Sequence, residues 1–180
     1  HQSQPADSRP PPHPDQHGFN VVTAVPSGNW CEEVAQYVDA LPSEIRYILL
    51  MVEDTLFMKP VDGARLNEVA YYAMGLSYVR LVPVRRRWRL LPKEIDPPLE
   101  CIKPSEPYYS STEMAIWDRY YLREQLDLPG DAWSFEHHVS RRAHWAVREA
   151  VFEQNQIVQK GKWNWDAPRM LRQAGVDNPD

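Results

Sequence analysis

A continuous apolar run occupies residues 47–52 and is followed at once by two acidic residues, Glu53 and Asp54. Such a run, rich in aliphatic and β-branched residues, predicts a strand that is buried on both faces. In open α/β sheets, ligands bind at the carboxyl ends of the strands. Two adjacent carboxylates in this position therefore indicate a candidate functional site at the strand end.

Helical periodicity is found on both sides of this strand. Apolar residues recur at helical spacing over residues 30–41, after Ser27 and Asn29, either of which is a suitable N-cap. A second helix is predicted from residue 60 to residue 74, with Asp62 as its N-cap.

A second strand is predicted at residues 78–82, after Gly75 ends the helix. The order strand, helix, strand is typical of a βαβ unit, so we predict an α/β fold in which the two strands are neighbours. Arg80 interrupts the second strand, and a buried guanidinium group needs a polar partner. Glu53 or Asp54 on the neighbouring strand is the candidate for that role.

Weaker patterns surround these elements. The charged residues 85–91 are consistent with an edge strand, and the prolines within residues 92–107 indicate a surface excursion. The remaining predicted elements are strands at 19–25, 108–117 and 151–158, and helices at 118–126, 135–147 and 168–173.

Composition narrows the classes of protein. The formal net charge of −5 at pH 7 is opposite in sign to the surface that binds nucleic acid, so we expect no nucleic-acid partner. Residues 1–18 are polar and rich in proline, which predicts a disordered tail or linker ahead of a single domain over residues 19–175. No apolar stretch approaches the roughly 18 residues that span a bilayer, so we predict no transmembrane segment.

The chain has two cysteines, Cys31 and Cys101. Their spacing fits neither a zinc site nor a disulfide framework. We expect two free thiols in a reducing compartment, with a single disulfide as the alternative.

Two groups of residues carry candidate chemistry. Glu53 and Asp54 supply the oxygen ligands that Mg²⁺ or Mn²⁺ prefers, although a solvated turn capped by Asp54 is the alternative. Trp133 and Phe135 flank Glu136, and aromatic faces beside a carboxylate suit a site that handles sugars. The alternative is that both aromatic residues belong to the core and Glu136 lies in the first turn of a helix.

The histidines do not form a metal site by spacing. His137 and His144 are seven residues apart, or about two helical turns, which is too far to share one ion. We therefore expect them at the surface or as helix-capping residues.

Several short motifs, taken in order, resemble bacterial glycosyltransferase-like proteins of the GT-A type, which are often encoded among surface-polysaccharide genes. The motifs are WCEEV at 30–34, VEDTLF at 52–57, VD at 61–62, RLVP at 80–83, AIW at 115–117, WSFE at 133–136 and KGKW at 160–163. The resemblance implies a GT-A-like mixed sheet flanked by helices, and a cytoplasmic protein that is either free or peripheral at the inner membrane.

The resemblance also implies an activity, namely metal-assisted transfer of a sugar from a nucleotide-sugar donor to a carbohydrate acceptor. Asp54 and Glu53 stand where such enzymes hold Mn²⁺ or Mg²⁺ against the donor diphosphate. Glu136 would be the catalytic base near the acceptor hydroxyl. The substrate-binding residues that the resemblance implies are Trp133, which stacks on the acceptor, and Arg80, Lys160, Lys162 and Trp163.

The nucleoside pocket of GT-A enzymes is built from residues ahead of the acidic motif, and most of that half has no counterpart in this chain. An upstream domain or a partner chain would then supply the pocket. The alternative function is a non-catalytic carbohydrate-binding or assembly module derived from a glycosyltransferase. A phosphate-handling hydrolase is a third hypothesis, but no nucleophile motif accompanies the acidic pair.

Overall fold

The computed structural model describes residues 25–52, 55–84, 98–137, 140, 142–159, 162–173 and 175. The predicted tail at 1–18 and the predicted strand at 85–91 lie outside these residues, as do Glu53, Asp54 and Lys160. The predicted strand at 19–25 lies outside them except for Val25, which is not in a strand.

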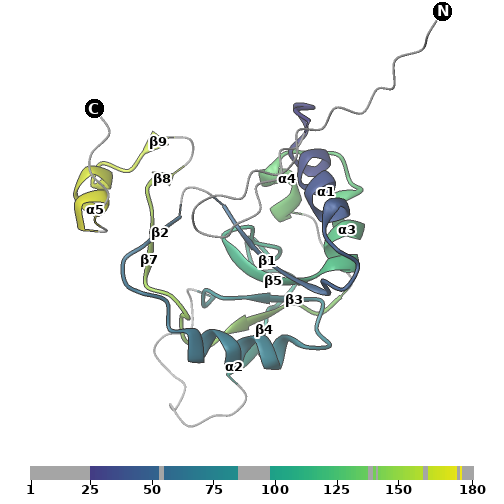
Figure 1. The fold of residues 1–180 in the computed structure, drawn as a ribbon, viewed down its shortest axis with the longest axis horizontal. Coiled ribbons are helices and arrows are strands. Elements are labelled where there is room, and N and C mark those ends of the chain that lie inside the picture. The colour runs from purple at the N-terminus through teal and green to yellow at the C-terminus, as the bar shows by residue number, and fades with distance from the viewer. Residues whose placement is uncertain are drawn as a thin grey trace, which may run out of the picture.

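A five-stranded mixed sheet forms the centre of the molecule (Figure 1). Its spatial order is β1-β5-β3-β6-β4, in which β3 and β6 are parallel and the other neighbours are antiparallel. The strands are β1 (Tyr47–Met51), β3 (Tyr78–Arg80), β4 (Leu99–Cys101), β5 (Met114–Asp118) and β6 (Trp145–Val147). The predicted α/β class with a mixed sheet flanked by helices is therefore confirmed.

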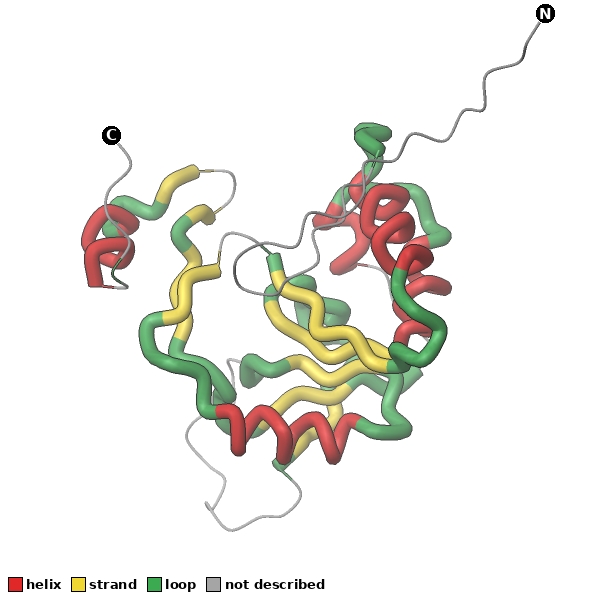
Figure 2. The backbone as a smooth tube through the Cα atoms, viewed as in Figure 1, coloured by secondary structure: helices red, strands yellow, loops and turns green. Residues whose placement is uncertain are grey.

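Helices cover both faces of this sheet. Figure 2 shows α1 (Trp30–Ala40), α3 (Arg119–Leu126) and α4 (Ala132–His137) on one side, and α2 (Gly63–Ala73) on the other. Successive residues of β5 alternate between the two layers, as the period of two in a strand requires. Trp117 packs with α1, α3 and α4, whereas Ile116 packs with α2.

The predicted helix boundaries agree with the structure because local capping residues set them. The Asn29 side chain accepts a hydrogen bond from the backbone N–H of Glu32, and Asp62 Oδ1 accepts from two N–H groups of α2. Gly75, just beyond α2, has a φ of +88°, a left-handed conformation that glycine adopts without a steric penalty. The predicted short helix near residue 170 is also present, as α5 (Ala167–Gln173).

Three predictions about the sheet are wrong. β1 and β3 are not neighbours, because β5 lies between them and pairs with both. β1 is not buried on both faces either. It is an edge strand of the sheet that the structure describes, and Leu49 and Met51 are 46% and 44% exposed. The proline-rich 92–107 segment is not only a surface excursion, since it carries β4, the other edge strand.

The predicted helix at residues 135–147 is correct only as far as His137. α4 ends at His137, and the chain then forms the short strand β6, which is pinned between β3 and β4. The predicted strand at 151–158 is shorter in the structure. It is present as β7 (Gln154–Gln156), which pairs with β2 (Thr55–Phe57) outside the main sheet.

The C-terminal elements lie to one side of the main sheet in Figure 1, beyond β2 and β7. They are β8 (Val158–Gln159), its antiparallel partner β9 (Lys162–Trp163), and α5. Among the residues that the structure describes, no helix has the length and apolar character needed to cross a membrane. Cys31 and Cys101 are free thiols, as predicted.

Candidate functional site

A run of five hydroxyl-bearing residues precedes β5 and forms the centre of the candidate site. These residues are Tyr108, Tyr109, Ser110, Ser111 and Thr112, and we call them the 108–112 segment. All except Tyr108 are buried, and Tyr108 has a φ of +55°. The left-handed region is costly for a residue with a side chain, so the surrounding contacts must hold this segment in place.

Glu136 of α4 binds the C-terminal end of the 108–112 segment. Its Oε1 accepts three hydrogen bonds, from the backbone N–H of Thr112 at 2.6 Å, from the Thr112 hydroxyl at 2.8 Å and from the Ser111 hydroxyl at 3.3 Å. Hydrogen bonds to a carboxylate are stronger than those between neutral groups, so the side chain has a fixed orientation. Its second oxygen, Oε2, has no hydrogen-bond partner among the described residues.

Arg80 of β3 binds the other end of the segment. Its side chain is buried, with the residue only 8% exposed, and its guanidinium group donates to the carbonyl of Tyr108. Arg80 Nε also donates to the Tyr78 hydroxyl at 3.5 Å, and that hydroxyl donates to the carbonyl of Ser111 at 3.1 Å. The described partners of Arg80 are thus a carbonyl and a phenol. The expected pairing with Glu53 or Asp54 lies outside the described residues, but its premise that β1 and β3 are neighbouring strands is wrong, because β5 separates them.

Burial keeps the Tyr78 phenol neutral. Desolvation raises its pKa above the usual value of 10.0, and the nearby charge of Glu136 raises it further, whereas Arg80 and the bond to Ser111 act in the opposite direction. The neutral phenol therefore remains a hydrogen-bond donor, and it links β3 to the 108–112 segment.

His144 lies beneath the 108–112 segment in the core and not at the surface, so the predicted surface or capping role is wrong for this residue. Its Nδ1 is 3.0 Å from the Tyr109 carbonyl oxygen, which can only accept, so Nδ1 carries the proton. Its Nε2 then accepts from the Tyr121 hydroxyl at 2.6 Å. Burial lowers the pKa of His144 to about 4, and the charge of Arg80 also lowers it, against the raising effect of the Tyr109 carbonyl.

Three aromatic side chains lie at the surface beside Glu136. Trp133 and Tyr108 are 50% and 40% exposed, and His137 is exposed as well. The Tyr108 ring lies 6.2 Å from the Trp133 ring and 5.5 Å from the His137 ring, measured between centroids. Trp133, Glu136 and His137 are at positions i, i+3 and i+4 of α4, so they share one face of that helix. The helix therefore presents a carboxylate and two rings to the 108–112 segment.

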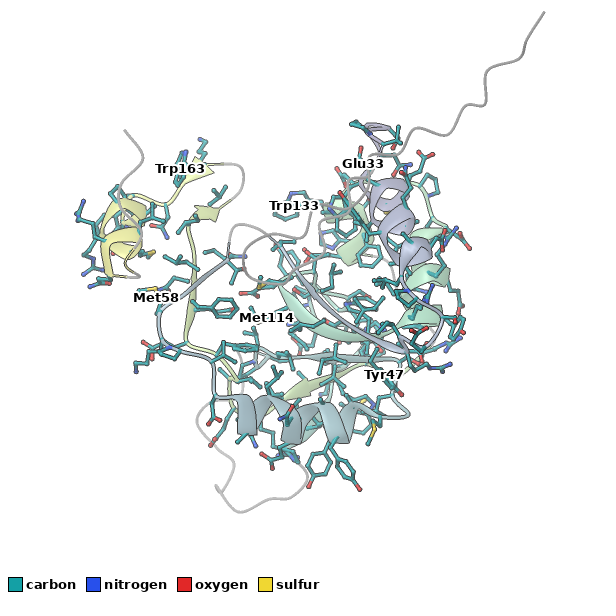
Figure 3. All side chains as sticks on the ribbon, viewed as in Figure 1. Glu33, Tyr47, Met58, Met114, Trp133 and Trp163 are labelled. Carbon is teal, nitrogen blue, oxygen red and sulfur yellow. The ribbon has the colours of Figure 1, made fainter. Side chains whose placement is uncertain are left out.

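The structure brings together only some of the predicted site residues. Glu136, Trp133 and Arg80 surround the 108–112 segment. Lys162 and Trp163 are exposed on β9, and Figure 3 shows Trp163 and Trp133 in separate parts of the molecule. Glu53, Asp54 and Lys160 are not among the described residues.

The described residues contain no group of three or more His, Cys, Asp or Glu side chains that could hold a metal ion. Because Glu53 and Asp54 are not described, their role as metal ligands stays a prediction.

Sequence reasoning missed Tyr108, Thr112 and His144 as members of this site. One signal was present, because five consecutive hydroxyl-bearing residues lie just ahead of a buried strand, and buried hydroxyl groups usually find hydrogen-bond partners. The partners described above, however, lie 24 to 35 positions away, before or after the segment, which no local pattern shows.

No protein-family model matches this chain, and neither the curated proteins nor the solved structures include a significant match. The resemblance to glycosyltransferases therefore depends on the motifs of the sequence itself. The local geometry can still be judged on its chemistry: an oriented carboxylate, one oxygen of which has no hydrogen-bond partner among the described residues, lies next to exposed aromatic rings.

Proposed function

We propose that this protein transfers a sugar from a nucleotide-sugar donor to a carbohydrate acceptor, and that the acceptor binds beside Glu136. The observation that carries this proposal is the arrangement of Glu136. One of its oxygens accepts three hydrogen bonds from Ser111 and Thr112, and exposed aromatic rings lie on the same helix face. Aromatic rings stack on the apolar faces of sugars, and a carboxylate accepts hydrogen bonds from their hydroxyl groups.

In this proposal Glu136 acts as the general base. Its Oε2 accepts the proton of an acceptor hydroxyl as that oxygen attacks the donor sugar, while Thr112 holds Oε1 in place. Trp133 stacks on the acceptor. The fixed orientation of the carboxylate matters, because general-base catalysis requires hydrogen-bond distance to the reacting hydroxyl.

The donor side of the proposal concerns other residues of the chain. Glu53 and Asp54 would hold Mn²⁺ or Mg²⁺, which neutralises charge on a departing nucleoside diphosphate when it is bound. Lys160, Lys162 and Trp163 would contact the donor, and an upstream domain or partner chain would complete the nucleoside pocket. A GT-A-like fold and a cytoplasmic location, free or at the inner membrane, belong to the same proposal.

A non-catalytic carbohydrate-binding module is the second candidate, and it accounts for the same hydrogen bonds. The three hydrogen bonds to Glu136 Oε1 hold the 108–112 segment against α4, which is a structural task that a binding module needs equally. In that case Glu136 would orient the ligand without taking up a proton.

Nucleotide-dependent thermal stabilisation separates the two candidates. We expect UDP or GDP with Mn²⁺ to raise the melting temperature, and Asp54→Asn to abolish the increase. Asp62→Asn is the matched control, because asparagine is also a good N-cap and Asp62 only caps α2. A wild-type protein that no nucleotide stabilises would favour the binding module over the transferase.

Glu136→Gln tests the base itself. The amide oxygen can still accept from Thr112, so we expect little change in melting temperature and an unchanged nucleotide effect. We expect the release of nucleoside diphosphate from UDP- or GDP-sugars, in the presence of an oligosaccharide acceptor, to be lost. Undiminished release by this variant would show that Glu136 is not the base.

A further inference from the structure

We propose that Tyr108 contacts a neutral pyranose at this site and sets its specificity, and that Arg80 is a positioning residue that holds Tyr108 in place. This inference rests on the proposed carbohydrate site. Tyr108 belongs to none of the sequence motifs, and its ring contacts residues that are distant in the sequence.

The backbone conformation of Tyr108 is strained. With a φ of +55°, a tyrosine costs about 1–2 kcal/mol that glycine would avoid. The residue nevertheless remains 40% exposed, so the strained conformation does not serve to bury the whole ring. A strained position that presents a large aromatic ring to solvent is typical of a residue that contacts a ligand.

The ring of Tyr108 completes a surface that α4 begins. Trp133 and His137 lie one helical turn apart, and the Tyr108 ring is within 6.2 Å and 5.5 Å of them between centroids. Glu136 lies on the same helix face, between the two. A sugar that stacks on Tyr108 and Trp133 therefore lies on the face that carries the Glu136 carboxylate.

The negative charge of the Glu136 carboxylate selects among sugars. The Glu136 carboxylate accepts hydrogen bonds from sugar hydroxyls, but it repels a second carboxylate such as that of a uronic acid. The guanidinium group of Arg80 does not offset this repulsion at the surface, because Arg80 is buried and donates to Tyr108 and Tyr78. We therefore assign the site to neutral pyranoses.

Arg80 determines where the Tyr108 ring lies. Its guanidinium group donates to the Tyr108 carbonyl, at the residue with the left-handed φ, while the Tyr78 hydroxyl holds the Ser111 carbonyl. Arg80 and Tyr78 both belong to β3, so the segment is attached to the central strand of the sheet. Lysine has a single ammonium group in place of the planar fork and cannot make both contacts with the same geometry.

Substitutions of Tyr108 give opposite results for a structural role and a ligand-contacting role. We expect Tyr108→Gly to melt at or above the wild-type temperature, because glycine relieves the strain, and to bind maltohexaose or cellohexaose at least about tenfold more weakly. Tyr108→Phe should bind like the wild type. Tyr71→Ala removes a more exposed tyrosine, 68% against 40%, on the opposite side of the sheet and should leave binding unchanged.

The role of Arg80 is tested by a double-mutant cycle, measured by isothermal titration with the same two oligosaccharides. Arg80→Lys should weaken binding in the wild-type background but not further in the Tyr108→Gly background. Equal weakening in both backgrounds would show that Arg80 does not act through Tyr108. Arg80→Gln serves as a second variant if Arg80→Lys does not fold, since its amide can still donate to the carbonyl.

The outcomes also separate this inference from the proposed function. If Tyr108→Gly binds maltohexaose or cellohexaose as tightly as the wild type does, the role of Tyr108 is overturned and the carbohydrate site remains intact. Tighter binding of hexagalacturonate than of maltohexaose or cellohexaose overturns the assignment to neutral sugars. A wild-type protein that binds none of the three oligosaccharides overturns both the carbohydrate site and this inference.

Discussion

The His144 ring stacks on the Tyr109 ring, with 4.2 Å between centroids and 7° between planes, and the same histidine lies 3.0 Å from the Tyr109 carbonyl oxygen. The backbone N–H of His144 also donates to the Tyr109 hydroxyl at 3.2 Å. One buried histidine therefore contacts three parts of one tyrosine. The imidazole therefore carries a single proton, on Nδ1, because Nε2 accepts a hydrogen bond from the Tyr121 hydroxyl.

The stability of the protein should fall in mild acid because of His144. Its pKa is about 4 in the folded state against an ordinary value of 6.5, so the unfolded chain binds more protons in this range. The contribution of His144 to the free energy of unfolding is fully present above about pH 6.5 and is lost as the pH falls toward about 4. We expect the free energy of unfolding in urea to be about 2 kcal/mol smaller at about pH 5 than at about pH 7.

His144→Gln is the control for this pH dependence. Carboxylates also titrate in mild acid, but the difference between the two proteins isolates the contribution of the imidazole. Arg80, Tyr109 and Tyr121 face the imidazole and remain in the variant. Equal losses of stability in both proteins would contradict this prediction.

Two glycines at opposite ends of α2 should respond differently to alanine. A Cβ atom added at Gly75 or at Gly63 meets nothing within 4 Å, so steric contacts do not distinguish them. Gly75 has a φ of +88°, whereas Gly63 has no left-handed φ. We expect Gly75→Ala to lower the free energy of unfolding by about 1 kcal/mol, and Gly63→Ala to leave it unchanged or raise it by about 0.5 kcal/mol.

Thermal or urea unfolding of both alanine variants gives the answer directly. Comparing the two variants removes any effect on stability that a glycine-to-alanine change has at both ends of α2. If Gly75→Ala is as stable as the wild type, the left-handed residue does not limit the end of this helix.

Asp118 should contribute more to stability than an ordinary helix cap. Its Oδ1 accepts from the backbone N–H groups of Tyr120 and Tyr121, both at 3.0 Å, and its Oδ2 lies 2.6 Å from Arg46 Nε. Asp118 is also buried, at 5% exposure. We expect Asp118→Ala to lower the free energy of unfolding by about 2–3 kcal/mol, measured in urea.

Asp62→Ala is the comparison, because Asp62 caps α2 in the same way but is exposed. It should cost only about 1 kcal/mol. Asp118→Asn keeps an oxygen that can cap α3 and should fall between the two. Equal costs for the two alanine variants would mean that burial and the Arg46 pair add nothing.

The two thiols should differ in reactivity. Cys31 is 1% exposed, and burial raises the pKa of its thiol, with Asp131 contributing in the same direction. Cys101 is exposed. We expect a thiol reagent such as Ellman's reagent to modify one cysteine rapidly in the native protein and the second only after denaturation. The fast reaction should disappear in Cys101→Ser, and its persistence there would show that Cys31 is accessible.

Local signals account for what could be predicted from the sequence. Asn29, Asp62 and Gly75 act on neighbouring backbone groups, so the ends of α1 and α2 were readable without tertiary information. β6 was not readable in this way. It has only three residues, and its pairing with β3 and β4 decides its conformation against the helical pattern of residues 135–147.

In the candidate site, too, contacts within one helix could be predicted and contacts between distant segments could not. Trp133 and Glu136 belong to one motif on one helix, so their proximity follows from helical spacing. Thr112 reaches Glu136 across 24 residues, and Arg80 reaches Tyr108 across 28. Contacts at these separations depend on the order of strands in the sheet, which the local patterns did not determine.

The position of β5 between β1 and β3 has a consequence during protein synthesis. β1 and β3 leave the ribosome well before residues 114–118, yet both pair with that later strand. Two strands of the nascent chain must therefore wait without their shared partner while more than thirty residues are added after Arg80. Because β3 and β4 also pair with β6, the central sheet can close only after Val147 has been translated, so its formation is a late event in the synthesis of this chain.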